Sequence, residues 1–277
     1  MVGALAGVAG VLGSLIGSFL NVVIFRLPAG RSIVAPPSAC GSCGGRIRPW
    51  DNVPVLSWLW LRGRCRDCAA GILIRYPLVE LGTAVSFAVV TWWVLSGGVV
   101  VGTGGPSATG GLLVTLVAFL YLASVSVALA MIDLDTHTLP NRIVLPAYPV
   151  AAVLLAGGAL LTESPGRLLT ALVGAATLFG LYLILALAYS GGMGLGDVKL
   201  AGLLGLYLGW LGWAPLVVGA FSAFLLGGLF SLVLVITRKA NRKSGIPFGP
   251  WMLVGAWLGI FCGEVIAIRY LSLFGLA

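Results

Sequence analysis

The 277-residue chain contains very few charged residues. Only 9% of its residues are Asp, Glu, Lys or Arg, whereas 60% are hydrophobic. Ordinary globular proteins contain about 25% charged residues, because a surface in water needs polar groups. The shortage of charge excludes a soluble globular domain, a disordered chain and a nucleic-acid-binding protein. The composition predicts an all-α polytopic membrane protein, in which the 41 glycines allow helices to approach closely.

Acidic residues are especially scarce. The chain has eight Asp and Glu against 16 Lys and Arg, which gives a formal net charge of +8. In a membrane protein, such an excess of bases marks the cytoplasmic loops. Eight arginines lie between Arg26 and Arg75, and four more bases lie between Arg238 and Lys243. We expect both segments to face the cytoplasm, where bases also attract anionic lipid.

Long apolar runs predict about eight transmembrane helices, because roughly 20 apolar residues cross the hydrocarbon core. No base precedes the first run, 3–25, whereas Arg26 follows it, so we place the N-terminus outside. The 37 apolar residues from Leu200 to Ile236 are too many for one crossing, and we expect a turn at 209–215. The glycine-rich stretch 99–110 predicts a short external loop. The remaining spans are expected at 77–98, 111–132, 142–161, 168–190 and 249–272.

This topology predicts three domains. They are a first transmembrane helix at 1–25, a small cytosolic domain at 26–76, and a seven-helix membrane domain at 77–277. Fourteen of the sixteen bases then lie in the four cytoplasmic segments, 26–75, 133–142, 191–199 and 238–247.

Four of the five cysteines form two Cys-x-x-Cys pairs separated by 21 residues: Cys40, Cys43, Cys65 and Cys68. Paired motifs of this kind fit a tetrahedral Zn²⁺ site. The segment is too small to bury a core of its own, so a structural metal would stabilise it. Two disulfides or four free thiols are the alternatives, and disulfides require an oxidising compartment. The fifth cysteine, Cys262, lies in the last span, where we expect a buried, small apolar side chain.

Acids within or beside membrane spans are candidates for function, because a charge in the bilayer is costly. Asp133 begins the sequence Asp-Leu-Asp-Thr-His-Thr-Leu-Pro, and Asp197 follows Gly192, Gly194 and Gly196. Both aspartates are expected at cytoplasmic helix ends, so they share one depth and could meet. Two close carboxyl groups keep one proton between them, so one can activate water while the other polarises a carbonyl. The pair predicts aspartyl proteolysis.

These motifs resemble those of the type IV prepilin leader peptidases, a family of GxGD-type intramembrane aspartyl proteases. Further similar blocks are 17–28, 50–59, 61–65 and 75–80. The resemblance implies that Asp133 and Asp197 are the catalytic pair, because the family's first aspartate lies seven residues before the proline that is here Pro140. Asp135 is the alternative. The resemblance further implies that the basic leader of a prepilin or pseudopilin is cleaved on the cytoplasmic side of the bacterial inner membrane.

The resemblance implies a second activity as well. Family members that contain the cysteine domain also methylate the new N-terminus from S-adenosylmethionine. By the same resemblance Glu80 belongs to this function, and an acid at the membrane interface is the alternative. The implied partners are the prepilin-like substrate and membrane lipid, without nucleic acid.

Other hypotheses use the same acids differently. A proton- or cation-coupled transporter would bind its ion at them, although the chain shows no obvious internal repeat. A metal site of Asp133, His137 and Asp197 is also conceivable, but the chain lacks a His-Glu-x-x-His motif. Lys199 either stabilises charge near Asp197 or anchors its helix in the cytoplasm.

Overall fold

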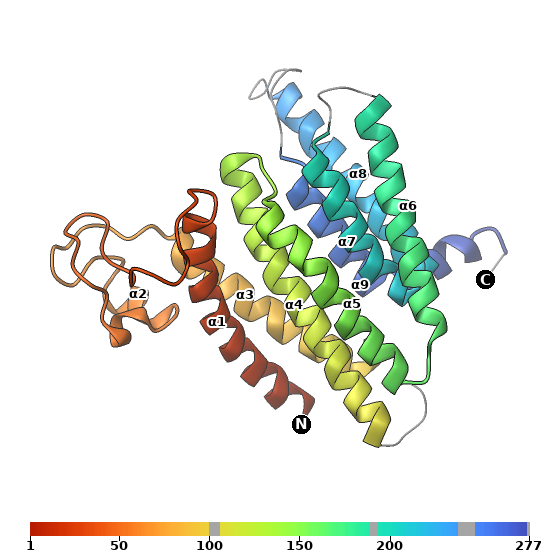
Figure 1. Cartoon of the computed structure of the whole chain (residues 1–277), viewed down its shortest axis with the longest axis horizontal. Helices are drawn as coiled ribbons and strands as arrows, with labels where there is room; N and C mark the ends of the chain where they lie inside the picture. Colours follow the sequence, from red (N-terminus) through yellow and green to blue (C-terminus); the bar gives the residue numbers. More distant parts are fainter. Residues whose placement is uncertain (100–105, 189–192, 238–246, 276–277) are drawn as a thin grey trace. The chain divides into compact units, whose positions relative to one another are not determined.

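The structure is a computed structural model that describes residues 1–99, 106–188, 193–237 and 247–275. Within these residues it is almost entirely helical and contains no β-strand beyond two isolated bridges. The long helices, labelled in Figure 1, are α1 (Val2–Arg26), α3 (Arg75–Trp93), α4 (Pro106–Thr136), α5 (Asn141–Leu161), α6 (Gly166–Ala188), α7 (Leu195–Leu211), α8 (Trp213–Ile236) and α9 (Gly249–Ser272).

Seven of the described helices are long and apolar enough to cross a membrane. They include every long helix except α7, and α3 reaches this length through a π-helical turn, η2 (Val94–Gly98). Helix α7 has 17 residues, or about 25 Å, which is slightly short for an untilted crossing. The predicted all-α polytopic membrane fold is confirmed.

The helix boundaries agree with the predicted spans, with one correction. The turn expected at 209–215 is present: α7 ends at Leu211, and Gly212, with φ +137°, leads directly into α8. The expected loop, 99–110, is longer than the observed one, because α4 already begins at Pro106. Proline favours the first turn of a helix. Residues 100–105 of that loop, 189–192 and 238–246 lie outside the described residues.

The chain forms two compact units, of which the first comprises Met1–Gly97 together with Phe119–Ala128. Helices α1 and α3 pack with almost no space between their backbones. A Cβ atom added at Gly13 would lie 2.8 Å from the carbonyl oxygen of Thr83, and one at Gly17 would lie 2.7 Å from the Cα atom of Glu80. The glycines therefore allow this close pairing.

Between α1 and α3 lies a loop-rich segment, residues 27–74, which we call the cysteine lobe. It contains a short 3₁₀ turn, η1 (Pro49–Asn52), and a short helix, α2 (Leu56–Trp60). Gly63 is the single buried residue in this segment. The lobe thus has no hydrophobic core of its own.

The second unit comprises Gly98–Ala118 and Leu129–Ala277, and α7 lies in its core. Every residue from Leu200 to Trp210 is buried, as expected for a helix that is apolar on all faces. A Cβ atom added at Gly174 on α6 would lie 2.6 Å from the carbonyl oxygen of Gly205 on α7. The indole N–H of Trp210 donates to the carbonyl of Leu155 on α5 at 3.2 Å. This packing fixes the position of α7 and of its N-terminus.

Cys262 on α9 is exposed, so the prediction that it is buried was wrong. The face of α9 that packs on α8 carries Gly255, Gly259 and Gly263, whose added Cβ atoms would each lie 2.6 Å or less from α8 backbone atoms. Cys262 lies beside this face. Hydrophobicity alone cannot separate the two faces, because lipid and protein interior are both apolar.

Candidate active site and metal centre

Asp133 lies one turn before the end of α4, and only 4% of its surface is exposed. Its Oδ2 atom accepts a hydrogen bond of 3.0 Å from the backbone N–H of Gly249, the first residue of α9. A Cβ atom added at Gly249 would lie 2.7 Å from this oxygen. The N-terminus of α9 therefore contacts the carboxylate directly, and its dipole favours the negative charge.

Asp197 occupies the third position of α7 and is half-buried. Its Oδ2 atom accepts a hydrogen bond of 3.1 Å from the backbone N–H of Gly194, the residue that caps the helix. A carboxylate in the first turn also interacts favourably with the helix dipole. The described part of the glycine motif thus forms the start of α7, and Gly192 lies outside the described residues.

The second unit gathers the start of α7, which carries Asp197, and the start of α9, which binds Asp133, around one residue. Leu139, in the turn between α4 and α5, lies beside both helix starts: an added Cβ atom at Gly196 would lie 3.1 Å from it, and one at Gly249 would lie 3.3 Å from it. Asp135 is exposed, although it is only two residues from Asp133.

The other polar residues near the pair have separate contacts. His137 has φ +52° in the turn after α4, and its backbone N–H donates to the carbonyl of Asp133 at 2.9 Å. Lys199 donates from Nζ to Oδ1 of Asn141 at 3.0 Å, which joins the starts of α7 and α5. Among the described residues, Asp133, His137 and Asp197 do not form a group able to hold a metal.

Two contacts near the pair were not predicted from the sequence. One is the bond from Gly249 to Asp133, for which the Gly249-Pro250 start of the last span is the only indication in the sequence. The other is a cluster of Tyr182, Phe224 and Phe248, with ring centroids 5.2 to 6.3 Å apart. Tyr182 is also close enough to Asp197 to interact with it electrostatically. These aromatic residues share no sequence pattern.

The four predicted metal ligands of the cysteine lobe come together. The Sγ atoms of Cys40, Cys43, Cys65 and Cys68 all lie within 4.8 Å of one another, and none of the four cysteines forms a disulfide. The two loops have matching backbone bonds: Cys40 N–H donates to the carbonyl of Gly45 at 2.9 Å, and Cys65 N–H donates to that of Ala70 at 2.8 Å. Two such loops suit a tetrahedral thiolate site.

Hydrogen bonds within the loops favour a charged thiolate. The backbone N–H groups of Cys43 and Ser42 lower the pKa of the Cys40 thiol to about 6. The N–H of Ala70 acts in the same direction on Cys68, but the neighbouring Cys43 thiol, burial and the other cysteines outweigh it and raise the pKa of Cys68 to about 12. Thiols that bind a metal lose their protons, so a bound cation would replace them.

Glu80 lies in the second turn of α3 and is 9% exposed, so it is not an acid exposed at the interface. Its Oε2 atom accepts a hydrogen bond of 2.7 Å from the backbone N–H of Val55. Val55 has φ +62°, an unfavourable value for a β-branched residue. The bond therefore helps to hold a strained turn at the start of α2.

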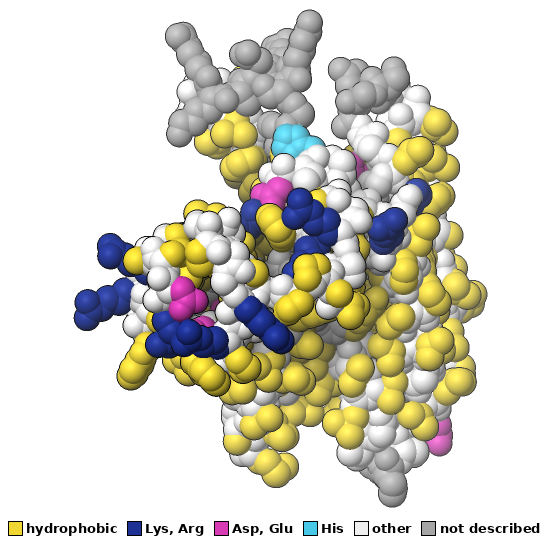
Figure 2. All heavy atoms as spheres, turned by 60° about the vertical axis from the view of Figure 1, so that its left-hand side comes forward, with side chains coloured by type: hydrophobic (Ala, Val, Ile, Leu, Met, Phe, Trp, Pro, Cys, Tyr) yellow, Lys and Arg dark blue, Asp and Glu magenta, His cyan; other side chains and the backbone are white. Residues whose placement is uncertain are grey.

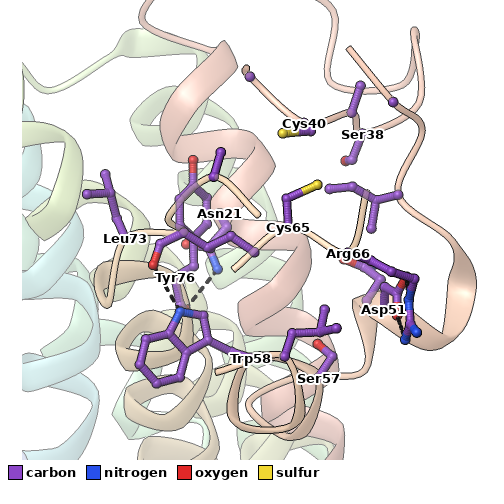
Figure 3. Close-up of a pocket in the computed structure, with 18 of the residues that line it drawn as sticks. Asn21, Ser38, Cys40, Asp51, Ser57, Trp58, Cys65, Arg66, Leu73 and Tyr76 are labelled. Atoms are coloured by element: carbon purple, nitrogen blue, oxygen red, sulfur yellow. Dashed lines mark hydrogen bonds and ion pairs between the residues drawn. The ribbon is translucent and has the colours of Figure 1, made fainter. Parts of the chain in front are cut away.

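Glu80 also lines a cavity of about 440 Å³ within the first unit, between the cysteine lobe and the adjoining ends of α1 and α3 (Figure 3). Two hydrogen bonds shape its wall: Trp58 Nε1–H donates to the carbonyl of Ile72, and Asn21 Nδ2–H donates to that of Tyr76, both at 3.1 Å. Asp51, paired with Arg66, also lines the cavity. A cavity of this volume is in the range that holds small ligands.

Comparison with known proteins assigns the region of the cysteine lobe and the region of the two aspartates to described families. Residues 11–94 match the Bacterial Peptidase A24 N-terminal domain, and residues 120–232 match the Type IV leader peptidase family. The chain is 36% identical to the prepilin leader peptidase/N-methyltransferase of Aeromonas salmonicida (strain A449), over 93% of this chain and 91% of that protein. It is 34% identical to the protein of that name from Pseudomonas putida, over 96% and 94% of the two chains. No solved structure shows significant similarity to the chain.

Proposed function

The chain belongs to the type IV leader peptidase family, and on this premise we propose that it is a membrane aspartyl endopeptidase that removes the basic leader from prepilin-like proteins. The observation that carries the proposal is that the start of α7, which carries Asp197, and the start of α9, which binds Asp133, both lie beside Leu139. Both aspartates lie within the region that matches the peptidase family. The transporter hypothesis has no support from these relatives.

The positions of the carboxylates support a mechanism without a cofactor. Each aspartate binds a glycine N–H group through Oδ2, which leaves its Oδ1 atom available for water or substrate. Two close carboxyl groups share one proton. The ionised carboxylate takes a proton from water while the water oxygen attacks the peptide carbonyl carbon, and the protonated one donates its proton to the carbonyl oxygen. When the C–N bond breaks, the leaving amine takes a proton back from the pair.

The test is to replace each aspartate by asparagine and to co-express the variant with a prepilin. Asparagine keeps the shape of the side chain and an oxygen that can accept the glycine N–H, so the fold should be retained. We expect Asp133→Asn and Asp197→Asn each to abolish leader removal, measured as the shift in pilin size on a gel. Asp135→Asn is the matched control and should process normally. Normal cleavage by either of the first two variants would refute the assignment.

We also propose that the cysteine lobe binds Zn²⁺ through Cys40, Cys43, Cys65 and Cys68, and that residues 26–76 act as a zinc-binding domain beside the peptidase domain at 77–277. The four clustered sulfurs support this choice, because thiolate sets of this geometry are typical of structural zinc. The consequence for stability is developed in the Discussion.

For the second activity in the name of the relatives, we propose that the cavity beside Glu80 binds S-adenosylmethionine, which supplies a methyl group for the new N-terminus of the pilin. The cavity residues fit this ligand: Trp58 and Tyr76 offer aromatic faces, and Glu80 offers negative charge to a sulfonium cation. Glu80 is also placed to accept a proton from the N-terminal ammonium group of the acceptor.

Glu80→Gln separates this role from a structural one, because glutamine can still accept the N–H of Val55 but carries no charge. We expect weaker binding of radiolabelled S-adenosylmethionine and loss of the methyl group from the intact mass of the pilin, with leader removal unchanged. Glu264→Gln, at an exposed acid of α9, is the control. Unchanged binding and methylation in Glu80→Gln would refute the role of Glu80.

We place the protein in the bacterial inner membrane, with its N-terminus outside and both the cysteine lobe and the aspartates on the cytoplasmic side. Eight crossings then leave the C-terminus outside, whereas seven would leave it inside. Alkaline phosphatase fused to the C-terminus should therefore be active. An inactive phosphatase fusion, combined with a fluorescent C-terminal green fluorescent protein fusion, would contradict the eight-crossing topology.

A further inference from the structure

The short helix α2 (Leu56–Trp60) exposes large apolar side chains. Leu56 is 65% exposed, Leu59 is 58% exposed and Trp60 is 83% exposed, and Trp50 in the neighbouring turn η1 is 63% exposed. Trp58 is the exception, because its indole N–H donates to the carbonyl of Ile72 and the residue lines the cavity (Figure 3). A group of exposed apolar residues so close in the chain marks an interaction surface.

The hydrogen bond between Val55 and Glu80 fixes the place of this surface relative to α3. Val55 immediately precedes α2, and Glu80 lies five residues into the membrane-spanning helix that begins at Arg75. Five helical residues correspond to about 7.5 Å along the helix axis. The start of α2 therefore lies beside the first two turns of α3, next to the end of a helix that is long and apolar enough to cross a membrane.

The charge of the surrounding segment complements anionic lipid. Residues 26–75 contain eight arginines and two aspartates, a net charge of +6. Both aspartates are already paired, Asp51 with Arg66 and Asp67 with Arg48. Arg62 and Arg64 follow α2 directly and are exposed. Figure 2 shows basic side chains, which in this lobe are all arginines, among hydrophobic ones.

We propose that Trp50, Leu56, Leu59 and Trp60 form an interfacial anchor that inserts into the headgroup region of the bilayer, and that Arg62 and Arg64 bind anionic phospholipid headgroups beside it. Tryptophan and leucine next to arginine are the residues that interfacial segments use. The anchor holds the cysteine lobe against the membrane on the side where α1 ends and α3 begins. It depends on the membrane location of the chain and not on its proposed catalytic activity.

The test uses the full chain in lipid nanodiscs, with the photoreactive residue p-benzoylphenylalanine in place of Trp60. The exposure of Trp60 means that this change leaves packed residues undisturbed. The matched control carries the same group at Pro37, an exposed position of the same lobe outside the cysteine loops and the cavity. We expect irradiation to add the mass of a phospholipid at position 60, with a yield several-fold above that at position 37. Equal yields at both positions, or an adduct of position 60 with a protein instead of lipid, would overturn the anchor.

A second comparison tests the arginines. Nanodiscs of phosphatidylcholine alone are compared with nanodiscs that also contain phosphatidylglycerol. We expect the anionic lipid to raise the cross-linking yield at position 60, and the double variant Arg62→Gln/Arg64→Gln to remove most of that increase. An equal increase in the double variant would refute the role of the arginines. Leader removal in detergent should be the same with and without these two substitutions, so this result is separable from failure of the peptidase proposal.

Discussion

The aspartate site and the cysteine lobe are stabilised in different ways. Around the aspartates, helices pack so closely that glycines are needed at the contacts, and a full stretch of α7 is buried. In the cysteine lobe, Gly63 alone is buried among residues 27–74. The first site is positioned by helix packing, whereas the second is positioned by four sulfurs and a few polar bonds. A single substitution should therefore affect stability and activity differently in the two regions.

The largest effect is expected in the cysteine lobe, where packing contributes least to stability. Replacing Cys40 or Cys65 by serine should remove bound zinc and unfold the cysteine lobe, because metal binding supplies about 10 kcal/mol or more to small domains of this type. The lobe should become sensitive to protease, while the helices of the second unit stay protected. Zinc content by mass spectrometry and limited proteolysis in detergent measure the two results.

Cys262→Ser is the control for this experiment, because Cys262 is an exposed cysteine of α9 outside the cluster. It should retain both the metal and protease resistance. If Cys40→Ser kept the same zinc content as the unmodified chain, the metal site would be wrong. If the helices of the second unit also became sensitive to protease, the two regions would not be independently stabilised.

The second-largest effect is expected from adding a single methyl group at the closely packed aspartate site. Gly249→Ala would place a Cβ atom 2.7 Å from Oδ2 of Asp133 and 3.3 Å from Leu139. The carboxylate or the start of α9 must then move, and a displacement of this kind costs about 100-fold in rate. We expect leader removal to fall by about that factor while zinc content stays constant.

The matched control is Gly228→Ala on α8, where an added Cβ atom would meet nothing within 4 Å. It should cleave at the rate of the unmodified chain, measured as the time course of leader removal in detergent. Equal rates for both variants would show that the contact between Gly249 and Asp133 does not position the catalytic group.

The features that these two experiments test also show how much of the structure could be predicted from the sequence. The spans follow from long apolar runs, the cysteine cluster follows from local spacing, and the choice of Asp133 and Asp197 follows from motifs within a few residues. The contacts of Gly249 with Asp133 and of Val55 with Glu80 join residues 116 and 25 positions apart, and no local pattern encodes them. The exposure of Cys262 was missed for a different reason, because apolar periodicity does not tell a lipid-facing side from a packed one.

The smallest effect is expected from a surface ion pair of the cysteine lobe. Arg66 bonds both carboxylate oxygens of Asp51 and holds the pKa of that carboxyl below its usual value. A lowered pKa in the folded state means that the pair stabilises the lobe above about pH 4, the value of an unpaired carboxyl, and that this contribution disappears as the pH falls through the lower, folded-state value. The Arg66 side chain is 38% exposed, so water screens this pair although Asp51 itself is largely buried. Asp51→Asn should therefore reduce the melting temperature only slightly at pH 7, and the difference should vanish in acid.

Tryptophan fluorescence during heating in detergent can measure this difference, because Trp58 and Trp60 lie within the cysteine lobe. Asp67→Asn is the matched control. Its pair with Arg48 is longer, at 3.3 Å, and its side chain is 46% exposed against 9% for Asp51, so its effect should be smaller still. A melting difference for Asp51→Asn that does not decrease as the pH is lowered would show that the aspartate acts through its shape and not its charge. Because neither pair supplies a buried core, both effects should remain far below that of losing one cysteine.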